Sequence, residues 1–362
     1  MRLQRFSTAL LIVSACGSSS AASEADSGVI ADVGTGPDAL SDPSPTLDAE
    51  SCAPVDPAAP TTFTVCSTGS GSFGRWTVDD FGLPAYDYTV HQDFDDRAIY
   101  PTTDGNEHRD HWSAFGNDRL NAILSNDGVV QVFTQDRGPT WLDVVDDDQG
   151  WFGGGFSWID DGAGAPWASA YRYRPIGAKV TRRFGSSYAE TSTEWRSVAV
   201  THRFHAPSGD VPYVVDDVIL TNTSDAPVTV RHYEAWDVAR RQLQGNWFVS
   251  GAASPSFPQT VRNQRDALSA YFDETPAWDP AQKLLRITRT PSSTGATALP
   301  APDAVSDLDA QPGDPFLAQL VGDVAEAWTD QSAFFGTGTT RLPDAVKLRS
   351  TGVVGARQNG AG

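Results

Sequence analysis

The feature that most restricts the fold is a β-hairpin signal within residues 112–137, WSAFGNDRLNAILSNDGVVQVFTQDR. Two runs rich in β-forming residues, 120–125 and 129–134, flank the turn residues Asp127-Gly128. Asp-Gly between two such runs favours a tight turn in which both central residues have positive φ. We therefore expect two antiparallel strands joined by this turn.

Other segments of the chain repeat this β pattern. Polar turns that contain proline separate them, which is typical of an antiparallel meander and not of alternating strands and helices. Each of these strands has one face in solvent and one apolar face, and two sheets must pack together to bury the apolar faces. The sequence therefore predicts an all-β fold, a large two-sheet antiparallel β-sandwich. The expected strands are residues 86–90, 179–184, 194–206 (with Val198, Val200, His202 and Phe204 on one face), 213–222 and 228–238; residues 316–328 are expected to form a single helix or a loop.

Charge and aromatic content narrow the classes of ligand. The formal net charge of −20 argues against nucleic acid and against an anionic membrane surface, since both are bound by clustered Lys and Arg. Eleven tryptophans in 362 residues favour a carbohydrate ligand, although most tryptophans in any protein fill the core. No cofactor is expected.

The first sixteen residues have the pattern of an export signal. Arg2 and Arg5 precede a short apolar run that is too short to span a bilayer, and Val-Ser-Ala-Cys16 resembles a bacterial lipobox. We expect lipidation of Cys16 and an exported cell-envelope lipoprotein; ordinary secretion with cleavage nearby is the alternative. The Ser-, Ala-, Asp- and Pro-rich residues 17–60 predict a disordered linker, followed by a domain over residues 61–350 and a disordered tail, 351–362.

Two cysteines remain after Cys16. In an exported protein, Cys52 and Cys66 are expected to form a disulfide, with two free thiols as the alternative. A loop of this length would stabilise the start of the domain by about 3 kcal/mol. No Cys-x-x-Cys pair supports a zinc site.

Three segments in order resemble a known family. The hairpin is similar to a "GN-R--A--SN-G" segment, VVDDVILTNTSDAPVTVRHYEAWDV to "TLTNTSDRPR-LSLFSYVEW", and DPFLAQLVGDVAEAWTDQSAFFGTGTTRLPDAV to "FLA-L---PDAW-TDR--FFG-GG---P-AV". These are segments of the N-terminal sandwich of glycoside hydrolase family 94, the former glycosyltransferase family 36 of cellobiose phosphorylases and cyclic glucan synthases. The resemblance covers roughly residues 70–347 and implies a galactose mutarotase-like supersandwich.

In that family an (α/α)6 barrel comes after the sandwich and carries the general acid and the phosphate-binding residues. Twelve helices of average length need on the order of 140 residues, and only residues 347–362 come after the last similar segment. We therefore expect a carbohydrate-binding module without its own catalysis. The alternatives are a truncated or split phosphorylase or glucosyltransferase acting on β-glucosides, and an envelope protein without a ligand.

The candidate sugar-binding residues lie around the hairpin. Planar polar groups beside an aromatic plate suit sugar hydroxyls and the apolar face of the ring. In the family, loops at the charged end of this hairpin face the catalytic cleft, which favours Asp136 and Arg137. The partners implied are an oligosaccharide or β-glucan and a separate helical catalytic subunit or a second copy of the chain. The expected site is Trp112, Gln135, Asp136, Arg137 and Trp141, with structural roles favoured for Asn117, Arg119 and Asn126.

Other chemistries have weaker signals. Asp146-Asp147-Asp148 and Asp160-Asp161 are expected to be solvated turn residues, because the glycine and glutamate of a calcium loop are missing. His108 and His111 lie in a polar cluster, residues 104–111, where a loop is favoured over a metal site. No Gly-x-Ser-x-Gly elbow or phosphate-binding glycine loop occurs.

Overall fold

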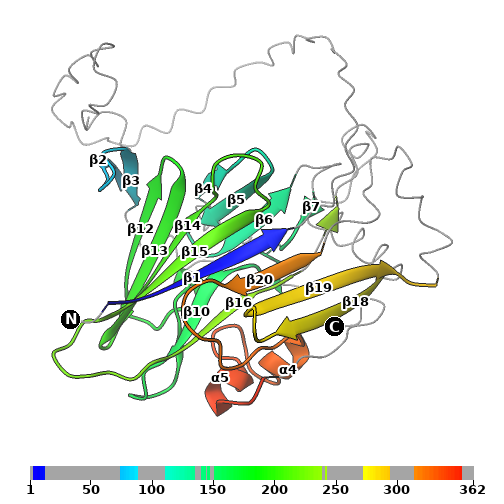
Figure 1. The fold of residues 1–362 in the computed structure, drawn as a ribbon. Coiled ribbons are helices and arrows are strands. Elements are labelled where there is room, and N and C mark those ends of the chain that lie inside the picture. Colours follow the sequence, from blue (N-terminus) through cyan, green and yellow to red (C-terminus); the bar gives the residue numbers. More distant parts are fainter. Residues whose placement is uncertain are drawn as a thin grey trace, which may run out of the picture.

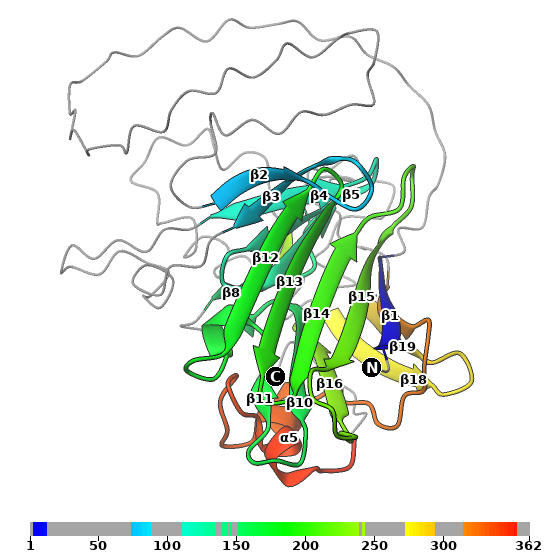
Figure 2. The same cartoon turned by 90° about the vertical axis from the view of Figure 1, so that its left-hand side faces the viewer.

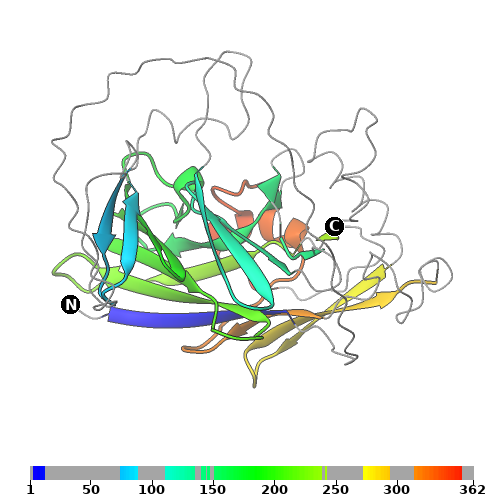
Figure 3. The same ribbon diagram turned by 90° about the horizontal axis from the view of Figure 1, so that it is seen from above.

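Two antiparallel sheets form the bulk of the molecule, so the predicted all-β sandwich is confirmed (Figure 1). The structure is a computed structural model that describes residues 3–12, 74–88, 111–134, 140–143, 145–146, 151–238, 241–242, 272–293 and 314–352. In the view from above (Figure 3), blue β1 and yellow β18 and β19 lie along one side of the molecule, with the teal strands of the smaller sheet across from them.

The larger sheet has ten strands and consists of antiparallel neighbours (Figure 2). Its order is β18 (Phe272–Asp279), β19 (Leu284–Pro291), β20 (Pro315–Gln319), β1 (Leu3–Ile12), β15 (Tyr213–Asn222), β14 (Val198–His205), β13 (Tyr188–Trp195), β12 (Lys179–Gly185), β3 (Pro84–Tyr88) and β2 (Gly74–Val78).

The smaller sheet has eight strands and pairs β10 with three neighbours, β6, β11 and β16. Its strands are β4 (Trp112–Gly116), β5 (Leu120–Ser125), β6 (Val130–Thr134), β7 (Thr140–Trp141), β10 (Gly154–Asp160), β11 (Trp167–Ala168), β16 (Arg231–Trp236) and β17 (Arg241–Gln242); β8 (Val145–Asp146) and β9 (Trp151–Phe152) form a separate ribbon.

The core lies between the sheets and continues beneath two short helices. The alternation predicted for β14 is confirmed, since Val198, Val200, His202 and Phe204 are buried and the residues between them are only partly buried. All of β10 is buried, because the larger sheet covers one face and α4 (Gln331–Phe335) and α5 (Asp344–Leu348) cover the other. Both faces of this strand are buried even though it contains Ser157 and Asp160, which have hydrogen-bond partners.

The predicted hairpin is confirmed, but its turn differs from the expected one. The amide of Gly128 donates to the carbonyl of Ser125 (3.0 Å), and the amide of Ser125 donates to that of Val129 (3.1 Å). The loop therefore has three residues, and within it only Gly128 has positive φ, 76°. This is the loop that combines a type I turn with a left-handed glycine, so Asp127 needs no positive φ.

Three other expectations need correction. Residues 194–206 are not one strand: β13 ends at Trp195, Arg196 turns the chain with φ 54°, and β14 begins at Val198. Residues 316–319 belong to β20, which pairs with β19 and β1, and the loop alternative holds for residues 320–328. The strand expected at 86–90 is β3, Pro84–Tyr88.

The segment expected to be an export signal is a strand in the sheet. The backbone of Leu3–Ile12 pairs with β15 on one side and with β20 on the other. Whether these residues are also cleaved on export stays a prediction, as does the lipidation of Cys16. Cys16, Cys52 and Cys66 lie outside the described residues.

Candidate functional site

Of the five predicted sugar-binding residues, the structure describes Trp112 and the backbone of Trp141. Trp112 is 58% exposed on β4, and its Cα partner is Ser125 at the turn end of β5. Trp141 pairs with Phe133, which in turn pairs with Asn121 near the other end of β5. The two tryptophan positions are therefore roughly four residues, or about 13 Å, apart along the strands. Gln135, Asp136 and Arg137 lie outside the described residues.

The structural roles favoured for three hairpin residues are confirmed. Asn117 caps the turn before β5 by accepting from the amide of Leu120 (3.0 Å), and its Nδ2 donates to the carbonyl of Val211 (2.7 Å). Arg119 donates through Nη2 to Asp210 (2.7 Å). Asn126 is fully buried, and its amide donates to the carbonyl of His111 (2.7 Å).

The acidic pair Asp160-Asp161 is not solvated, contrary to expectation. Asp160 is 3% exposed and accepts two hydrogen bonds from Arg349, at 2.6 and 3.1 Å. Asp161 accepts from Arg196 at 2.6 Å. Both carboxylates also accept backbone amides of the following turn, so the expectation of turn residues holds. The ion pair with Arg349 lowers the pKa of Asp160 below its ordinary value.

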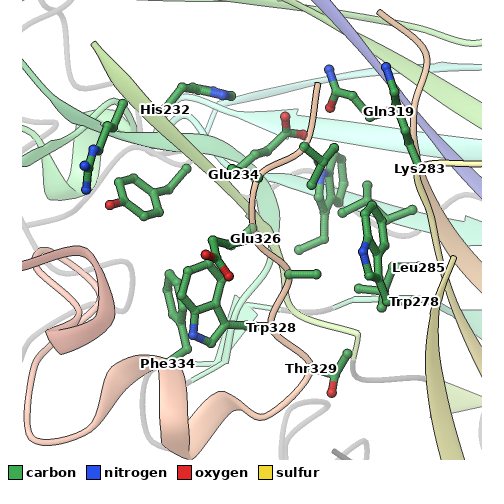
Figure 4. A pocket seen from close by; sticks show the side chains of 18 of the residues that line it. His232, Glu234, Trp278, Lys283, Leu285, Gln319, Glu326, Trp328, Thr329 and Phe334 are labelled. Atoms are coloured by element: carbon green, nitrogen blue, oxygen red, sulfur yellow. Dashed lines mark hydrogen bonds between the residues drawn. The ribbon is translucent and has the colours of Figure 1, made fainter. Parts of the chain in front are cut away.

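A cavity of about 1000 Å³ lies at one end of the sandwich, between β16, the strands β18 to β20, and residues 323–332. Figure 4 shows Trp278 and Leu285 on one side of this cavity and Trp328 with Phe334 on the other. Its walls come from both sheets and from the segment that leads into α4. Trp112, in the described part of the hairpin site proposed from the sequence, does not line it.

Neighbouring rings hold Trp328 in the wall of the cavity. Its indole lies 5.6 Å from the ring of Phe334 and 6.4 Å from that of Tyr233. Trp278 is carried by β18, which pairs with β19 along its whole length. Both indoles are half-buried. The two aromatic plates are therefore fixed by separate elements.

The polar lining of the cavity is mainly acidic. Glu234 accepts from the indole N–H of Trp236 (2.9 Å), and Glu326 accepts from the amide of Gly352 (2.8 Å) while the residue stays exposed. Lys283 donates to Asp323 (2.9 Å) and to the carbonyl of Gly322. Because Arg349 is paired with Asp160, two of the three cationic side chains are engaged in ion pairs. The charged lining residues are Glu234, Asp237, Glu274, Asp323, Glu326, Asp330, Arg231, Lys283 and Arg349.

A buried polar chain connects the two sheets next to the cavity. Ser157 Oγ of β10 lies 2.9 Å from His202 Nε2 of β14, and His202 Nδ1 lies 2.8 Å from Asp216 Oδ2 of β15. Ser157 Oγ also lies 2.6 Å from Nε2 of His232, which lines the cavity. A serine, a histidine and an aspartate that are hydrogen-bonded in this order also form the catalytic triad of serine hydrolases. However, Ser157 and His202 have no exposed surface, so the serine cannot meet a substrate in this arrangement.

Burial and neighbouring charges shift the pKa values of the two histidines, His202 and His232, in this hydrogen-bonded group. Burial alone would lower the pKa of His202, but the charge of Asp216 and its hydrogen bond outweigh burial and raise the pKa. Burial, together with the charge of His202, lowers the pKa of His232 to about 3. Burial also raises the pKa of Asp216, against the charge of His202. When His202 is protonated, its Nδ1 donates to Asp216 and its Nε2 donates to Ser157, and Ser157 then donates to neutral His232. These hydrogen bonds join β10 of the smaller sheet to β14 and β15 of the larger sheet.

The protonation of His232 predicts a loss of stability in mild acid. Its pKa in the folded state, about 3, lies below the ordinary 6.5. As the pH falls below 6.5, the unfolded chain binds a proton at His232 that the folded chain does not bind. The free energy of unfolding therefore falls by up to about 1.4 kcal/mol per pH unit. His202 acts in the opposite sense, because its raised pKa contributes stability that is lost as the pH rises through the folded value.

We expect His232→Gln, which keeps an acceptor for Ser157, to remove this acid sensitivity. Urea unfolding at pH 6.5 and 5 should show wild type losing up to about 2 kcal/mol more than the variant. Equal losses in the two proteins would contradict the neutral state of His232.

Sequence reasoning missed both the cavity and the polar chain. The cavity residues come from strands and loops far apart in the chain, and no short motif marks them. For the polar chain one signal was present: the sequence placed His202 on an apolar strand face, where a buried histidine needs partners. Asp216, on the neighbouring strand, could have been considered for that role.

Comparisons with known proteins do not identify a relative. No protein-family model matches the chain, and no curated protein matches it in sequence. Among the described residues, no group of three or more His, Cys, Asp or Glu side chains could hold a metal ion. No helix in the described part of the chain is long and apolar enough to cross a membrane.

Proposed function

We propose that this chain binds an oligosaccharide in the cavity between β16, β18 to β20 and residues 323–332. The observation that carries the proposal is the placement of Trp278 and Trp328 on different walls of one cavity that carboxylates, among them Glu234 and Glu326, also line (Figure 4). Indole faces cover the apolar C–H surface of a sugar ring, and carboxylates accept its hydroxyls. A volume of about 1000 Å³ is at the upper end for small-molecule sites and leaves room for several sugar units.

The charge of the cavity favours neutral sugars. Six carboxylates face three cationic side chains, and two of those cations are engaged in ion pairs with Asp323 and Asp160. A phosphate or uronate group entering this cavity would meet like charges with few cations to bind it. The proposal is therefore binding of neutral oligosaccharides, with β-glucans the first to test because of the resemblance found in the sequence. It includes no catalytic step.

The test is calorimetric titration of wild-type chain with cello-oligosaccharides and with β-1,2- and β-1,3-glucan oligosaccharides. We expect Trp278→Ala and Trp328→Ala each to weaken binding about tenfold or more, because each removes an aromatic plate from the site. A Tm measurement for each variant separates lost binding from lost folding, since Trp328 also packs on Phe334.

Trp112→Ala is the matched control. It removes an exposed indole that lies outside the cavity and that the sequence places in the hairpin site. Unchanged binding by this variant supports the cavity. A loss with Trp112→Ala but not with the two cavity variants would move the site to the hairpin, and absence of binding by any neutral oligosaccharide would refute the proposal.

A further inference from the structure

Strand β1 lies in the interior of the larger sheet and not at its edge. It lies between β15 and β20, and its backbone pairs with Tyr213–Thr221 on one side and with Pro315–Gln319 on the other. The described residues of β20 have only two strand partners, β1 and β19. In the described sheet, β1 is therefore the connection between the strands β18 to β20 and the six strands from β15 to β2.

Removal of β1 would leave a gap one strand wide. The facing edges of β15 and β20 would then present unpaired N–H and C=O groups, which readily pair with another extended chain. The residues that form this strand have the composition of an export signal, with Arg2 and Arg5 before an apolar run and a lipobox-like Val-Ser-Ala-Cys16. An exported chain cleaved before Cys16 would have this gap.

We infer that the gap between β15 and β20 is a binding site for a strand donated by a second polypeptide, antiparallel to both edges. Such strand addition takes its affinity from main-chain hydrogen bonds and its specificity from alternate side chains. The donated strand takes the place of residues 3–12 in the cleaved chain and reconnects the wall of the cavity that carries Trp278.

The neighbouring strand defines the sequence that fits. On β15, Val214, Asp216, Val218 and Leu220 are buried at alternate positions. The register of β1 pairs Leu10 with Val214, Thr8 with Asp216 and Phe6 with Val218. A matching partner segment therefore has apolar residues opposite Val214 and Val218 and a small polar residue opposite Asp216, since directly opposite residues in a sheet share a face.

The site can be opened in the full-length chain by Ala9→Pro. Ala9 pairs with both Val215 and Ala318, so a proline there removes a ladder amide at a central position. A labelled peptide with the sequence LQRFSTALLI is the probe, and the same peptide with proline at the Ala9 position is its control. We expect the variant to bind the probe one to one and to regain Tm on binding. Its affinity for the probe should be at least tenfold higher than that of the wild-type chain, and at least tenfold higher than its own affinity for the control peptide.

Crosslinking tests the register independently of the size of the Tm change. In the Ala9→Pro chain with Val215→Cys, a probe with cysteine at the Ala9 position should form a disulfide, and a probe with cysteine at the Ser7 position, which pairs with Asp217, should not. Mass spectrometry maps the linked peptides. If the variant fails to fold alone, refolding with the probe should rescue it. Absence of rescue or binding, or equal crosslinking in both registers, overturns the inference.

Discussion

Replacing Asp216 with alanine is expected to lower the free energy of unfolding by about 3–5 kcal/mol, because it leaves a buried charge without its partner. Asp216 is 1% exposed and His202 is fully buried, with 2.8 Å between the carboxylate and Nδ1. Removal of the carboxylate forces His202 either to stay charged without a counter-ion or to lose its proton. Urea unfolding at pH 7 measures the difference.

The control is the double variant Asp216→Val with His202→Leu. Replacement of a buried ion pair by apolar residues of similar volume is often nearly neutral, and Ser157 keeps His232 as a hydrogen-bond partner. We therefore expect the double variant to be more stable than Asp216→Ala alone. A cost below about 1 kcal/mol for the single variant, or additive costs in the double variant, would show that the two side chains do not act as a buried pair.

The parts of the fold that could be predicted from the sequence are those encoded locally. A strand with one buried face alternates with period two, so β14 was visible in the sequence. The predicted bounds of β15, 213–222, agree with the structure. Gly128 marked the hairpin turn, because a left-handed residue is strongly favoured to be glycine.

Two of the wrong expectations concern residues whose environment comes from distant parts of the chain. Apolar and polar residues do not alternate strongly over residues 316–328, yet β20 forms because its backbone pairs with β19 on one side and β1 on the other. Asp160 was expected in solvent, but Arg349, which is 189 residues away in sequence, covers it. Tertiary pairing of this kind overrides local preference and leaves no local signal.

The candidate site could not be predicted for the same reason. Trp278 and Trp328 lie in one cavity because β18 and the segment before α4 both line it, together with β16. Each tryptophan taken alone is as consistent with a core residue as with a binding residue. The hairpin was singled out because its signals are contiguous, whereas the cavity is assembled from separate stretches of sequence between residues 152 and 351.

Replacement of Trp158 with alanine should cost about 3–5 kcal/mol of stability, the other large effect that we expect. Trp158 has no exposed surface, and its ring lies 4.9 Å from Phe156 and 5.4 Å from Phe334 of α4. Its indole N–H donates to the carbonyl of Thr340 (2.9 Å), between the two helices. The variant therefore loses both a core side chain and the bond that ties the helical segment to β10.

Two tryptophan variants separate these contributions. Trp158→Phe keeps an aromatic ring but leaves the carbonyl of Thr340 without this donor, so we expect an intermediate loss of about 1–3 kcal/mol. Trp112→Ala removes an indole that is 58% exposed and should change stability by less than about 1 kcal/mol. Urea unfolding gives the three values, and hydrogen exchange over residues 331–348 reports whether the helical segment opens.

Loss of the Trp158 side chain should also affect the cavity. Phe334 contacts both Trp158 and Trp328, at 5.4 and 5.6 Å between ring centres, so loosening α4 frees one wall of the proposed sugar site. We expect Trp158→Ala to weaken oligosaccharide binding even under conditions where the chain remains folded, although Trp158 does not line the cavity. Unchanged exchange over residues 331–348 together with unchanged binding would show that α4 is held without Trp158, and that the cavity wall is independent of the core beneath it.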